Sequence, residues 1–402
     1  MNAELAPYLM IPFLTAFVGW STNWVGIKMI LYPKNWVGIG SFIGWQGIVP
    51  RMRQRLTRLL VRNSVTMVCT PQDLVEAMNE QDALDTIAEI IEPQLELWID
   101  DIMEEHGANY WSIAPKSLRK IVYDKVREEF PSLTRSILHD MGQRADELVD
   151  IEELAVAQAR DNPGIATDLL TNLAGFELRF IIMNGLYLGF PLGCIQAICW
   201  YVWPSVWVLP AFGVFVGAFT NWIALQIVLR PGEPVNILGY KLQGIFIKRQ
   251  TIASRKFADA FTQDFLDVRR LFDHVWTDKN ADEAHRMVRR RIREMMDKNL
   301  ITSSFNKVMQ VTGQSKDFDT QAIEVVRDRL VRTLQRPKVV NRLRKPIADL
   351  LAERLTTLTP KQFQNLLKPM FDSEQWIVVT VGGLLGGAAG TAQLVYLFGQ
   401  SL

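Results

Sequence analysis

Residues Gly19–Pro33 read GWSTNWVGIKMILYP, which places consecutive polar residues inside an otherwise apolar stretch. Residues Gly217–Pro231 read GAFTNWIALQIVLRP, so the Thr-Asn-Trp core and the closing proline recur 198 residues later. The chain has 402 residues, and one repeat unit is therefore close to half of it. A repeat of this length predicts two structurally equivalent halves.

The repeat extends well beyond these two stretches. QGIVPR begins at Gln46 and GLYLGFPLGCIQ begins at Gly185, and the second half contains QGIFIK from Gln243 and GGLLGGAAGTAQ from Gly382. Each of these second copies follows its first by 197 residues. Each unit therefore starts and ends with an apolar stretch and carries a charged region between them.

The composition is that of a mixed chain. Hydrophobic residues make up 49% and charged residues 22%, with a net charge of +1, so the charge balance does not point to nucleic acid as a partner. Apolar stretches that alternate with charged ones are typical of a membrane protein with large soluble parts. The cysteines Cys69, Cys194 and Cys199 are odd in number and form no C-x-x-C pair, which argues against a disulfide framework.

Four stretches are long and apolar enough to cross a bilayer, which takes about 20 residues. We predict an all-α integral membrane protein with four transmembrane helices in two parallel repeats and with long-helix cytoplasmic domains. The predicted segments are transmembrane helices at 1–32, 179–204, 205–230 and 375–400, interfacial or re-entrant loops at 33–50 and 231–247, and cytoplasmic helical domains at 51–178 and 248–374.

Two features predict helices in the soluble regions. Apolar residues recur at helical spacing in two sets, Ala284, Val288, Ile292 and Met296, and Ile323, Val326, Leu330 and Leu334. The tetrapeptides TPQD from Thr70 and TPKQ from Thr359 combine an N-cap threonine, a proline at the first helical position and an acid or amide three residues after the threonine.

Flanking charge sets the predicted orientation. Arginines without acids follow the first span, lysines and arginines follow the third, and the short loop between the second and third spans carries no charge. Because positive charge marks the cytoplasmic side, we predict that both large domains are cytoplasmic and that both termini lie outside.

The motifs together resemble a known family. Three motifs are similar to those of the bacterial membrane-protein family catalogued as domain of unknown function 445. They are the starting T-N-x-x-x-x-(K/Q)-x-x-x-x-P stretch, the Q-G-x-x-(P/I)-(K/R) element and the closing G-x-x-x-G-x-x-Q span. The resemblance covers essentially the whole chain, with Ile247 in place of Pro50 in the second copy. It implies a multi-pass protein of the bacterial inner membrane and carries over no activity or cofactor.

The polar residues within the predicted spans are the first candidate site. An amide in hydrocarbon needs a hydrogen-bond partner. Either it fixes one helix against another, or it lines a solute path, or it caps a broken helix. Helix packing is the simplest interpretation. The candidates are Thr22, Asn23, Trp24, Thr220, Asn221, Trp222, Gln196 and Gln393.

Glycines spaced by four residues form a second candidate feature, because they give a helix a smooth face for close packing. The partner is either the other glycine-containing span or a second molecule, which leaves a homo-oligomer open. The glycines are Gly185, Gly189, Gly193, Gly382, Gly386 and Gly390.

Basic residues at the span ends are candidates for contact with anionic lipid headgroups. Topology alone explains them equally well. The residues are Lys28, Arg51, Arg53, Lys248 and Arg249.

The sequence indicates no catalytic constellation, metal ligand set or cofactor motif. The acids and histidine in Asp100–His106 are dense, but a solvated helix face explains them better than a metal site. We therefore expect a non-catalytic multi-pass inner-membrane protein whose cytoplasmic helices bind membrane lipid or a protein partner. An oligomeric transporter or channel is the alternative, and a membrane-bound enzyme ranks third.

Overall fold

The computed structural model is mostly helical. It describes residues 6–40, 43–65, 68–77, 80–106, 111–237, 240–266, 270, 275–276, 281–297, 324–325, 337–372 and 375–398. The chain divides into two compact units. Unit 1 comprises residues 1–65, 155–260 and 352–402, and unit 2 comprises residues 66–154 and 261–351.

Unit 1 contains the apolar helices and two β-hairpins. Its elements are α1 (Ala6–Leu31), β1 (Val37–Ile39), β2 (Ile43–Trp45), α2 (Ile48–Arg51), α3 (Arg53–Leu60), the π-helix η2 (Val61–Val65), α11 (Ile165–Val202), α12 (Val208–Leu229), β3 (Val235–Ile237), β4 (Tyr240–Leu242), α13 (Ile245–Lys248), α20 (Pro360–Asp372) and α21 (Gln375–Phe398). Three helices contribute residues to both units, namely α10 (Ile151–Asp161), α14 (Gln250–Asp264) and α19 (Pro337–Thr357).

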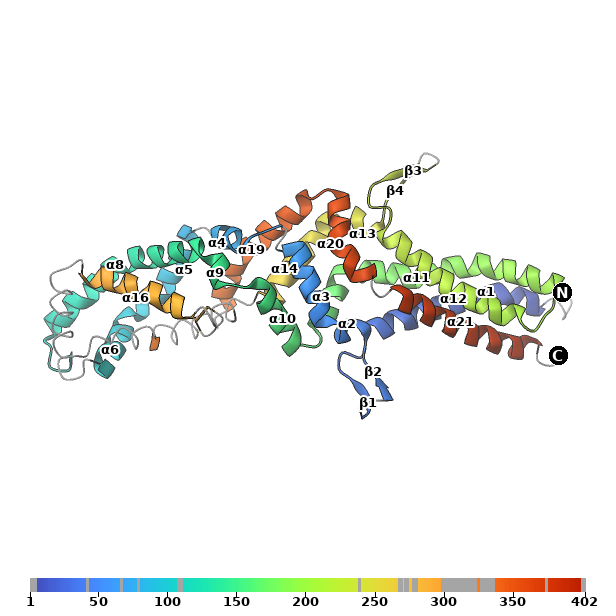
Figure 1. Cartoon of the computed structure of the whole chain (residues 1–402), viewed down its shortest axis with the longest axis horizontal. Helices are drawn as coiled ribbons and strands as arrows, with labels where there is room; N and C mark the ends of the chain where they lie inside the picture. Colours follow the sequence, from blue (N-terminus) through green and yellow to red (C-terminus); the bar gives the residue numbers. More distant parts are fainter. Residues whose placement is uncertain are drawn as a thin grey trace. The chain divides into compact units, whose positions relative to one another are not determined.

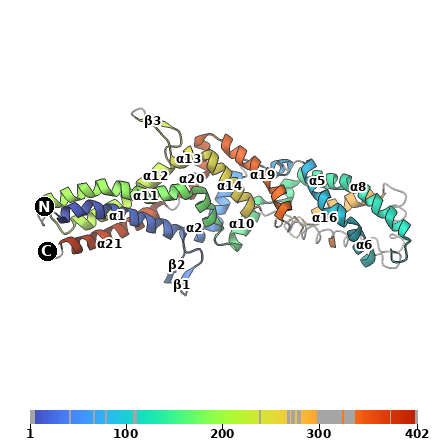
Figure 2. The ribbon, with the colours of Figure 1, turned by 180° about the vertical axis from the view of Figure 1, so that it is seen from behind.

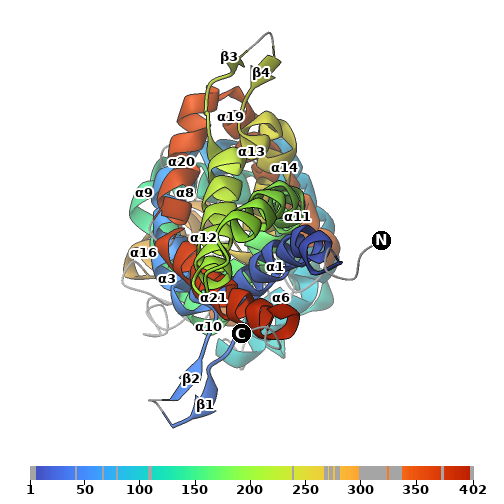
Figure 3. The same ribbon diagram turned by 90° about the vertical axis from the view of Figure 1, so that its right-hand side faces the viewer.

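Four long helices of unit 1 lie side by side, α1 against α11 and α12 against α21, and α1 also contacts α21 (Figures 1 and 2). Each helix supplies one residue to a buried apolar cluster at one end of this bundle, formed by Ile11, Trp200, Leu209 and Leu394. Figure 3 looks along the bundle and shows the two hairpins projecting away from it in different directions.

Three of these helices are long and apolar enough to cross a membrane, at Ile165–Val202, Val208–Val228 and Gln375–Leu397. The chain is therefore consistent with a membrane protein. The first predicted span, α1, has 26 residues and so a length of about 39 Å, which suffices for a bilayer. It is not among the three, and Ser21, Thr22, Asn23 and Lys28 are polar residues within it.

Two predicted boundaries differ from those of the structure. The helix containing the second span begins at Ile165, before the predicted start at 179, and Ala174 interrupts it with non-helical backbone angles. The predicted domain 51–178 is also divided between the two units, since residues 51–65 and 155–178 belong to unit 1 and residues 66–154 belong to unit 2. Packing between helices that are distant in sequence defines the two units, so cutting the chain into consecutive segments does not reproduce them.

The predicted interfacial loops contain short hairpins that an all-α prediction missed. Strand β1 pairs antiparallel with β2, and β3 pairs antiparallel with β4. Strands of three residues are too short to give a clear alternating pattern. In both copies the same contacts close the loop: the Gln46 amide donates to the Lys34 carbonyl at 2.9 Å, and the Gln243 amide donates to the Gly232 carbonyl at 3.1 Å.

Unit 2 is built from helices alone within its described residues. They are α4 (Pro71–Ala77), α5 (Glu80–Ile91), the 3-10 helix η3 (Glu92–Gln94), α6 (Leu95–His106), α8 (Lys116–Gln143), α9 (Ala145–Leu148) and α16 (Ala281–Asp297). Helix α16 packs against α8, and Asp140 binds Arg291 through both carboxylate oxygens, at 2.7 and 2.8 Å. The hydrogen-bonded Arg291 guanidinium lowers the pKa of the Asp140 carboxyl.

The two predicted helix starts are confirmed. Asp73 accepts from the Thr70 backbone N–H at 2.7 Å while Thr70 Oγ1 accepts from the Asp73 N–H, and Gln362 and Thr359 make the same reciprocal pair. The apolar face of α16 is also confirmed where it is described, since Ala284 and Val288 are buried in one cluster with Ile292 against it. Met296 and the apolar set from Ile323 to Leu334 lie outside what the structure describes at side-chain level.

Candidate functional site in the helix bundle

Both glycine series lie at close crossings within one half of the chain. A Cβ at Gly185 would collide with the Gly19 carbonyl of α1, and a Cβ at Gly189 would lie 2.8 Å from the Ala16 Cα. Gly193 is equally close to Pro12 on the same helix. The first series therefore packs on the preceding helix of its own half.

The second series repeats this arrangement on α12. A Cβ at Gly382 or Gly386 would collide with backbone or side-chain atoms of Asn221, Gly217 or Gly213, and Gly390 faces Leu209. The two partners that the sequence suggested, the other glycine series and a second molecule, do not occupy these faces. The contact of each glycine series with the preceding helix of its own half could have been predicted, since Gly19 and Gly217 on those helices already belong to the repeated motif.

Asn23 joins three helices. Its Nδ2 donates to the Ile181 carbonyl of α11 at 2.7 Å, and its Oδ1 accepts from Thr220 Oγ1 of α12 at 3.3 Å. Asn23 has 0% exposure and Thr220 also has 0%, so these bonds are shielded from solvent. Both ends of the amide have partners, which is what a packing role requires.

Asn221 is the counterpart of Asn23 and is bound at only one end. Its Nδ2 donates to the Val378 carbonyl of α21 at 3.0 Å. Its Oδ1 is buried and accepts no hydrogen bond from the described residues. The equivalent donor, Thr22, instead donates to the Gly19 carbonyl of its own helix at 3.1 Å. A buried acceptor without a partner costs about 1–3 kcal/mol.

Helices α1 and α12 continue through these asparagines without interruption. The interpretation of Asn as the cap of a broken helix is therefore wrong. Trp24 and Trp222 point away from the asparagines: they are 44% and 48% exposed, and each lies within a row of aromatic rings on the outer face of its helix.

The two predicted glutamines are buried on the glycine-bearing helices. Gln196 accepts from Thr15 Oγ1 of α1 at 2.6 Å, so it does link two helices. Gln393 is buried, and its Nε2 donates to no described residue. Gly213 stands in the second half where the first has Thr15, so the second half has no hydroxyl at that position.

The basic residues at the span ends divide into two groups. Arg53 donates to the Ala159 and Arg160 carbonyls at the end of α10, and Arg249 forms a 2.9 Å ion pair with Glu177. These two cations therefore serve contacts inside the protein. The other three, Lys28, Arg51 and Lys248, are exposed.

Glu177 is the residue that sequence reasoning missed. It lies on α11 with only 2% exposure, and its Oε2 has no hydrogen-bond partner among the described residues. The Arg249 guanidinium that binds its other oxygen also lies over the Phe176 ring, 4.4 Å from the centroid. The sequence did contain a signal for this residue, because Glu177 is a single acid next to the start of the predicted span 179–204.

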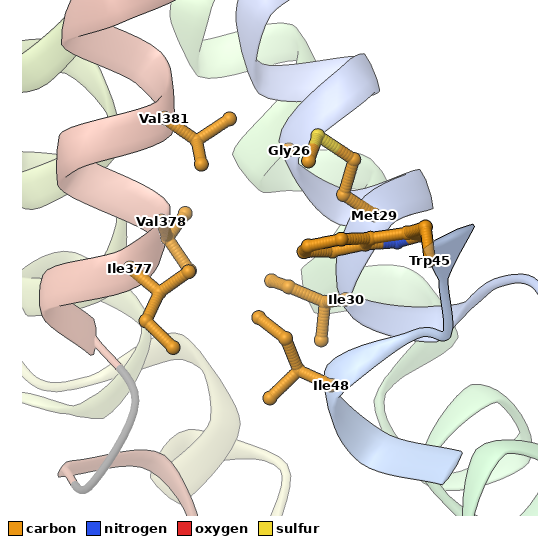
Figure 4. Close-up of a pocket in the computed structure, with 8 residues that line it drawn as sticks. All are labelled: Gly26, Met29, Ile30, Trp45, Ile48, Ile377, Val378 and Val381. Atoms are coloured by element: carbon orange, nitrogen blue, oxygen red, sulfur yellow. The ribbon is translucent and has the colours of Figure 1, made fainter. Parts of the chain in front are cut away.

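A small, open apolar pocket lies between the bundle helices α1 and α21; its space measures about 190 Å³ only when the adjoining solvent is counted. Figure 4 shows side chains from α1 and the β2–α2 segment facing those of α21 across the gap, with the Trp45 ring above Ile30 and Ile48. The lining residues are Gly26, Met29, Ile30, Trp45, Ile48, Ile377, Val378 and Val381. Neither asparagine lines it.

Within the described residues, no group of His, Cys, Asp and Glu side chains is arranged to hold a metal ion. In the Asp100–His106 stretch, Asp100 accepts hydrogen bonds from Trp111 Nε1 at 2.8 Å and from the Tyr123 hydroxyl at 2.5 Å. The Asp100 carboxylate therefore has a structural role in unit 2.

No protein-family model, curated protein or solved structure matches this chain. The function proposed for this chain therefore rests on the structure of the bundle and of the hairpins.

Proposed function

We propose that this chain is a non-catalytic, multi-pass protein of the bacterial inner membrane that binds anionic lipid at the cytoplasmic membrane surface. Four helices, α1, α11, α12 and α21, form the membrane anchor as two parallel repeats. Both large helical regions are cytoplasmic and both termini lie outside, as the flanking charge indicates. Membership of the family catalogued as domain of unknown function 445 is part of this proposal and rests on the repeated motifs.

The observation that carries the proposal is the exposed apolar surface of the β1–β2 hairpin. Ile39 is 85% exposed, Ile43 is 74% exposed and Val37 is 61% exposed, and Trp36 and Trp45 flank them. Exposed aliphatic side chains beside tryptophans suit a membrane–water boundary and are costly in water. The exposed cations Lys28 and Arg51 adjoin this hairpin in the chain and suit anionic headgroups.

A spin label at position 39 tests this placement in liposomes. Cys69, Cys194 and Cys199 are first replaced by alanine, and Ile39→Cys is compared with Ile113→Cys, which is 77% exposed in unit 2. We expect the label at 39 to be relaxed by oxygen and shielded from a water-soluble nickel complex, with the reverse at 113. Equal access of the nickel complex to both positions overturns the proposal.

The orientation has a separate test in intact cells. A membrane-impermeant maleimide is expected to label Trp207→Cys, in the loop between α11 and α12, and not Ile113→Cys. Trp207 is 78% exposed, so access within the protein does not limit labelling. Labelling at 113 without labelling at 207 reverses the predicted topology.

One observation favours a second candidate, an oligomeric channel or transporter. The Oδ1 of Asn221 and the Nδ2 of Asn184 are buried in the bundle and have no hydrogen-bond partner among the described residues, as a hydrated path would require. Loss of solute flux from liposomes in Asn23→Leu and Asn221→Leu, with the fold intact, favours this candidate. Unchanged flux removes it.

A further inference from the structure

We propose that the centre of the helix bundle binds one monovalent cation of the alkali class, such as Na⁺, where α1 and α12 contact each other. Its ligands are four side-chain oxygens, from Thr22 and Asn23 of α1 and from Thr220 and Asn221 of α12. The site lies within the bundle and does not depend on the lipid contact of the hairpin, which takes it beyond the proposed function.

The two asparagines are held in the same way in both halves. Asn23 Nδ2 donates to the Ile181 carbonyl and Asn221 Nδ2 donates to the Val378 carbonyl, and these carbonyls are themselves equivalent, since they lie 197 residues apart. With Nδ2 fixed, the opposite end of the Asn23 amide faces the other half of the chain, where its Oδ1 lies 3.3 Å from Thr220 Oγ1. The Oδ1 of Asn221 is therefore turned toward the first half in the equivalent way.

On the Asn221 side, two acceptors face each other. The repeat places Thr22 opposite Asn221, and the Asn221 amide does lie beside α1, because a Cβ at Gly26 would come within 3.9 Å of its Nδ2. Thr22 donates its hydroxyl proton to the Gly19 carbonyl, so its Oγ1 can offer Asn221 only lone pairs. Asn221 Oδ1 is buried without a hydrogen-bond partner among the described residues. A bound cation satisfies both oxygens at once.

The Asn23 side has a geometry that suits the same ion. The separation of 3.3 Å between Thr220 Oγ1 and Asn23 Oδ1 exceeds the range of about 2.5–3.0 Å for an ordinary O–H···O hydrogen bond. Oxygens at about 2.3–2.6 Å from one ion, as around Ca²⁺, lie about 3.3–3.7 Å apart when they bind at right angles. Since Na⁺ is close to Ca²⁺ in size, this separation suits two ligands of one Na⁺ as well as it suits a weak hydrogen bond.

The chemistry of the ligands selects a monovalent ion. All four are neutral amide or hydroxyl oxygens, and neither α1 nor α12 contains an acid. Sites for Ca²⁺ and Mg²⁺ rely on carboxylates, whereas neutral oxygens can replace the hydration shell of an alkali ion. The four side chains are at most 3% exposed, so the protein must supply that shell. Lys28, the one charged residue of α1, does not take this place, because its ammonium lies over the Tyr32 ring.

Equilibrium binding of radiolabelled Na⁺ to the full-length protein in nanodiscs tests the site, with N-methyl-D-glucamine chloride added to keep the ionic strength constant. We expect one saturable Na⁺ per chain. Thr22→Val and Thr220→Val each keep the shape of the side chain and remove a ligand oxygen, so each is expected to weaken binding about tenfold or more. Absence of saturable binding to the parent protein means that only water bridges these oxygens, and it overturns the proposal.

The matched control is Thr391→Val on α21. Thr391 also donates its hydroxyl proton to a carbonyl of its own helix, that of Gly387 at 2.9 Å, but it is exposed and lies outside the site. We expect this variant to bind Na⁺ as the parent protein does. Equal weakening in Thr22→Val and Thr391→Val overturns the assignment of the ligands.

Thermal unfolding provides a readout that separates ion binding from a general loss of stability. Because an ion that binds only the folded protein stabilises it, Na⁺ at constant ionic strength is expected to raise the unfolding temperature of the parent protein and of Thr391→Val. The same exchange of cations is expected to leave Thr22→Val unchanged, whatever its own stability. An equal rise in Thr22→Val and the parent protein overturns the proposal.

Discussion

Asn23 and Asn221 occupy equivalent places in the two halves. Among the residues that the structure describes, the amide of Asn23 has partners at both ends, whereas that of Asn221 has a partner only at its Nδ2. The difference arises from the threonines, since Thr220 donates across to the first half and Thr22 donates within its own helix. A sequence repeat therefore preserves the helix crossing and does not preserve every contact at it.

Both halves share the close helix crossing at their glycines. Substitution of a glycine at this crossing is expected to cause the largest loss of stability. Gly382→Ala places a Cβ against Asn221 and the Gly217 carbonyl, so overpacking is expected to cost about 1–3 kcal/mol. Gly185→Ala is expected to behave alike in the first half. Thermal unfolding in detergent measures the loss.

The matched control for this prediction is Gly383→Ala on the same helix. A Cβ there would lie 3.5 Å from the nearest atom, an ordinary van der Waals contact. We expect its stability to stay within about 0.5 kcal/mol of the parent protein. Equal destabilisation by Gly382→Ala and Gly383→Ala would show that the crossing is looser than the structure indicates.

The asparagines are where the halves are expected to differ. Asn23→Leu removes two hydrogen bonds worth about 0.6 kcal/mol each and leaves the Thr220 hydroxyl without its acceptor. Asn221→Leu removes one bond and also removes the unpartnered Oδ1, so it is expected to be close to neutral. Denaturant unfolding of both variants ranks them. A larger loss in Asn221→Leu contradicts the asymmetry.

The two halves also hold equivalent helix ends by different chemistry. Arg53 donates to carbonyls at the end of α10, whereas Gln250 at the corresponding position donates to the Leu355 and Leu358 carbonyls at the end of α19. A cation at a helix C-terminus contributes about 0.3–1 kcal/mol that salt weakens. Arg53→Gln is therefore expected to cost this amount in low salt and less in high salt.

Gln250→Ala serves as the neutral comparison for this cap. It removes hydrogen bonds worth about 0.5–1.5 kcal/mol each, and its effect is expected to be independent of salt. Unfolding midpoints of Arg53→Gln and Gln250→Ala, measured at two NaCl concentrations, show whether the loss of stability depends on salt. The same salt dependence in both variants would exclude a charge contribution from Arg53.

The smallest effect is expected for the ion pair that only the first half contains. Lys34 and Asp168 lie 2.7 Å apart with side chains 38% and 50% exposed, and Gly232 replaces the lysine in the second half. Lys34→Met is expected to cost about 0.2–1 kcal/mol, because exposed pairs contribute little. The loss should vanish in high salt through screening. A loss that persists in 1 M NaCl, where the Debye length is about 3 Å, points to packing of the lysine stem instead.

Much of the architecture follows from local sequence. The Thr-Asn-Trp repeat locates α1 and α12, the glycine series locate the faces that pack closely, and the reciprocal caps at Thr70 and Thr359 mark helix starts. These features depend on residues within one or two helical turns, so a linear pattern contains them. The helix that each glycine face contacts could also have been predicted, since Gly19 of α1 and Gly217 of α12 are part of the same sequence repeat.

The tertiary structure decided what depends on distant segments. The ion pair of Arg249 with buried Glu177 and the pocket between α1 and α21 join residues far apart in the chain. The three-residue hairpin strands also escaped prediction because their pairing depends on the partner strand more than on their own pattern. The sequence by itself determined that the two halves correspond. Only packing determined that Asn23 has a partner at each end of its amide while Asn221, among the described residues, has one only at its Nδ2, because a hydroxyl selects its acceptor by the rotamer that its neighbours allow.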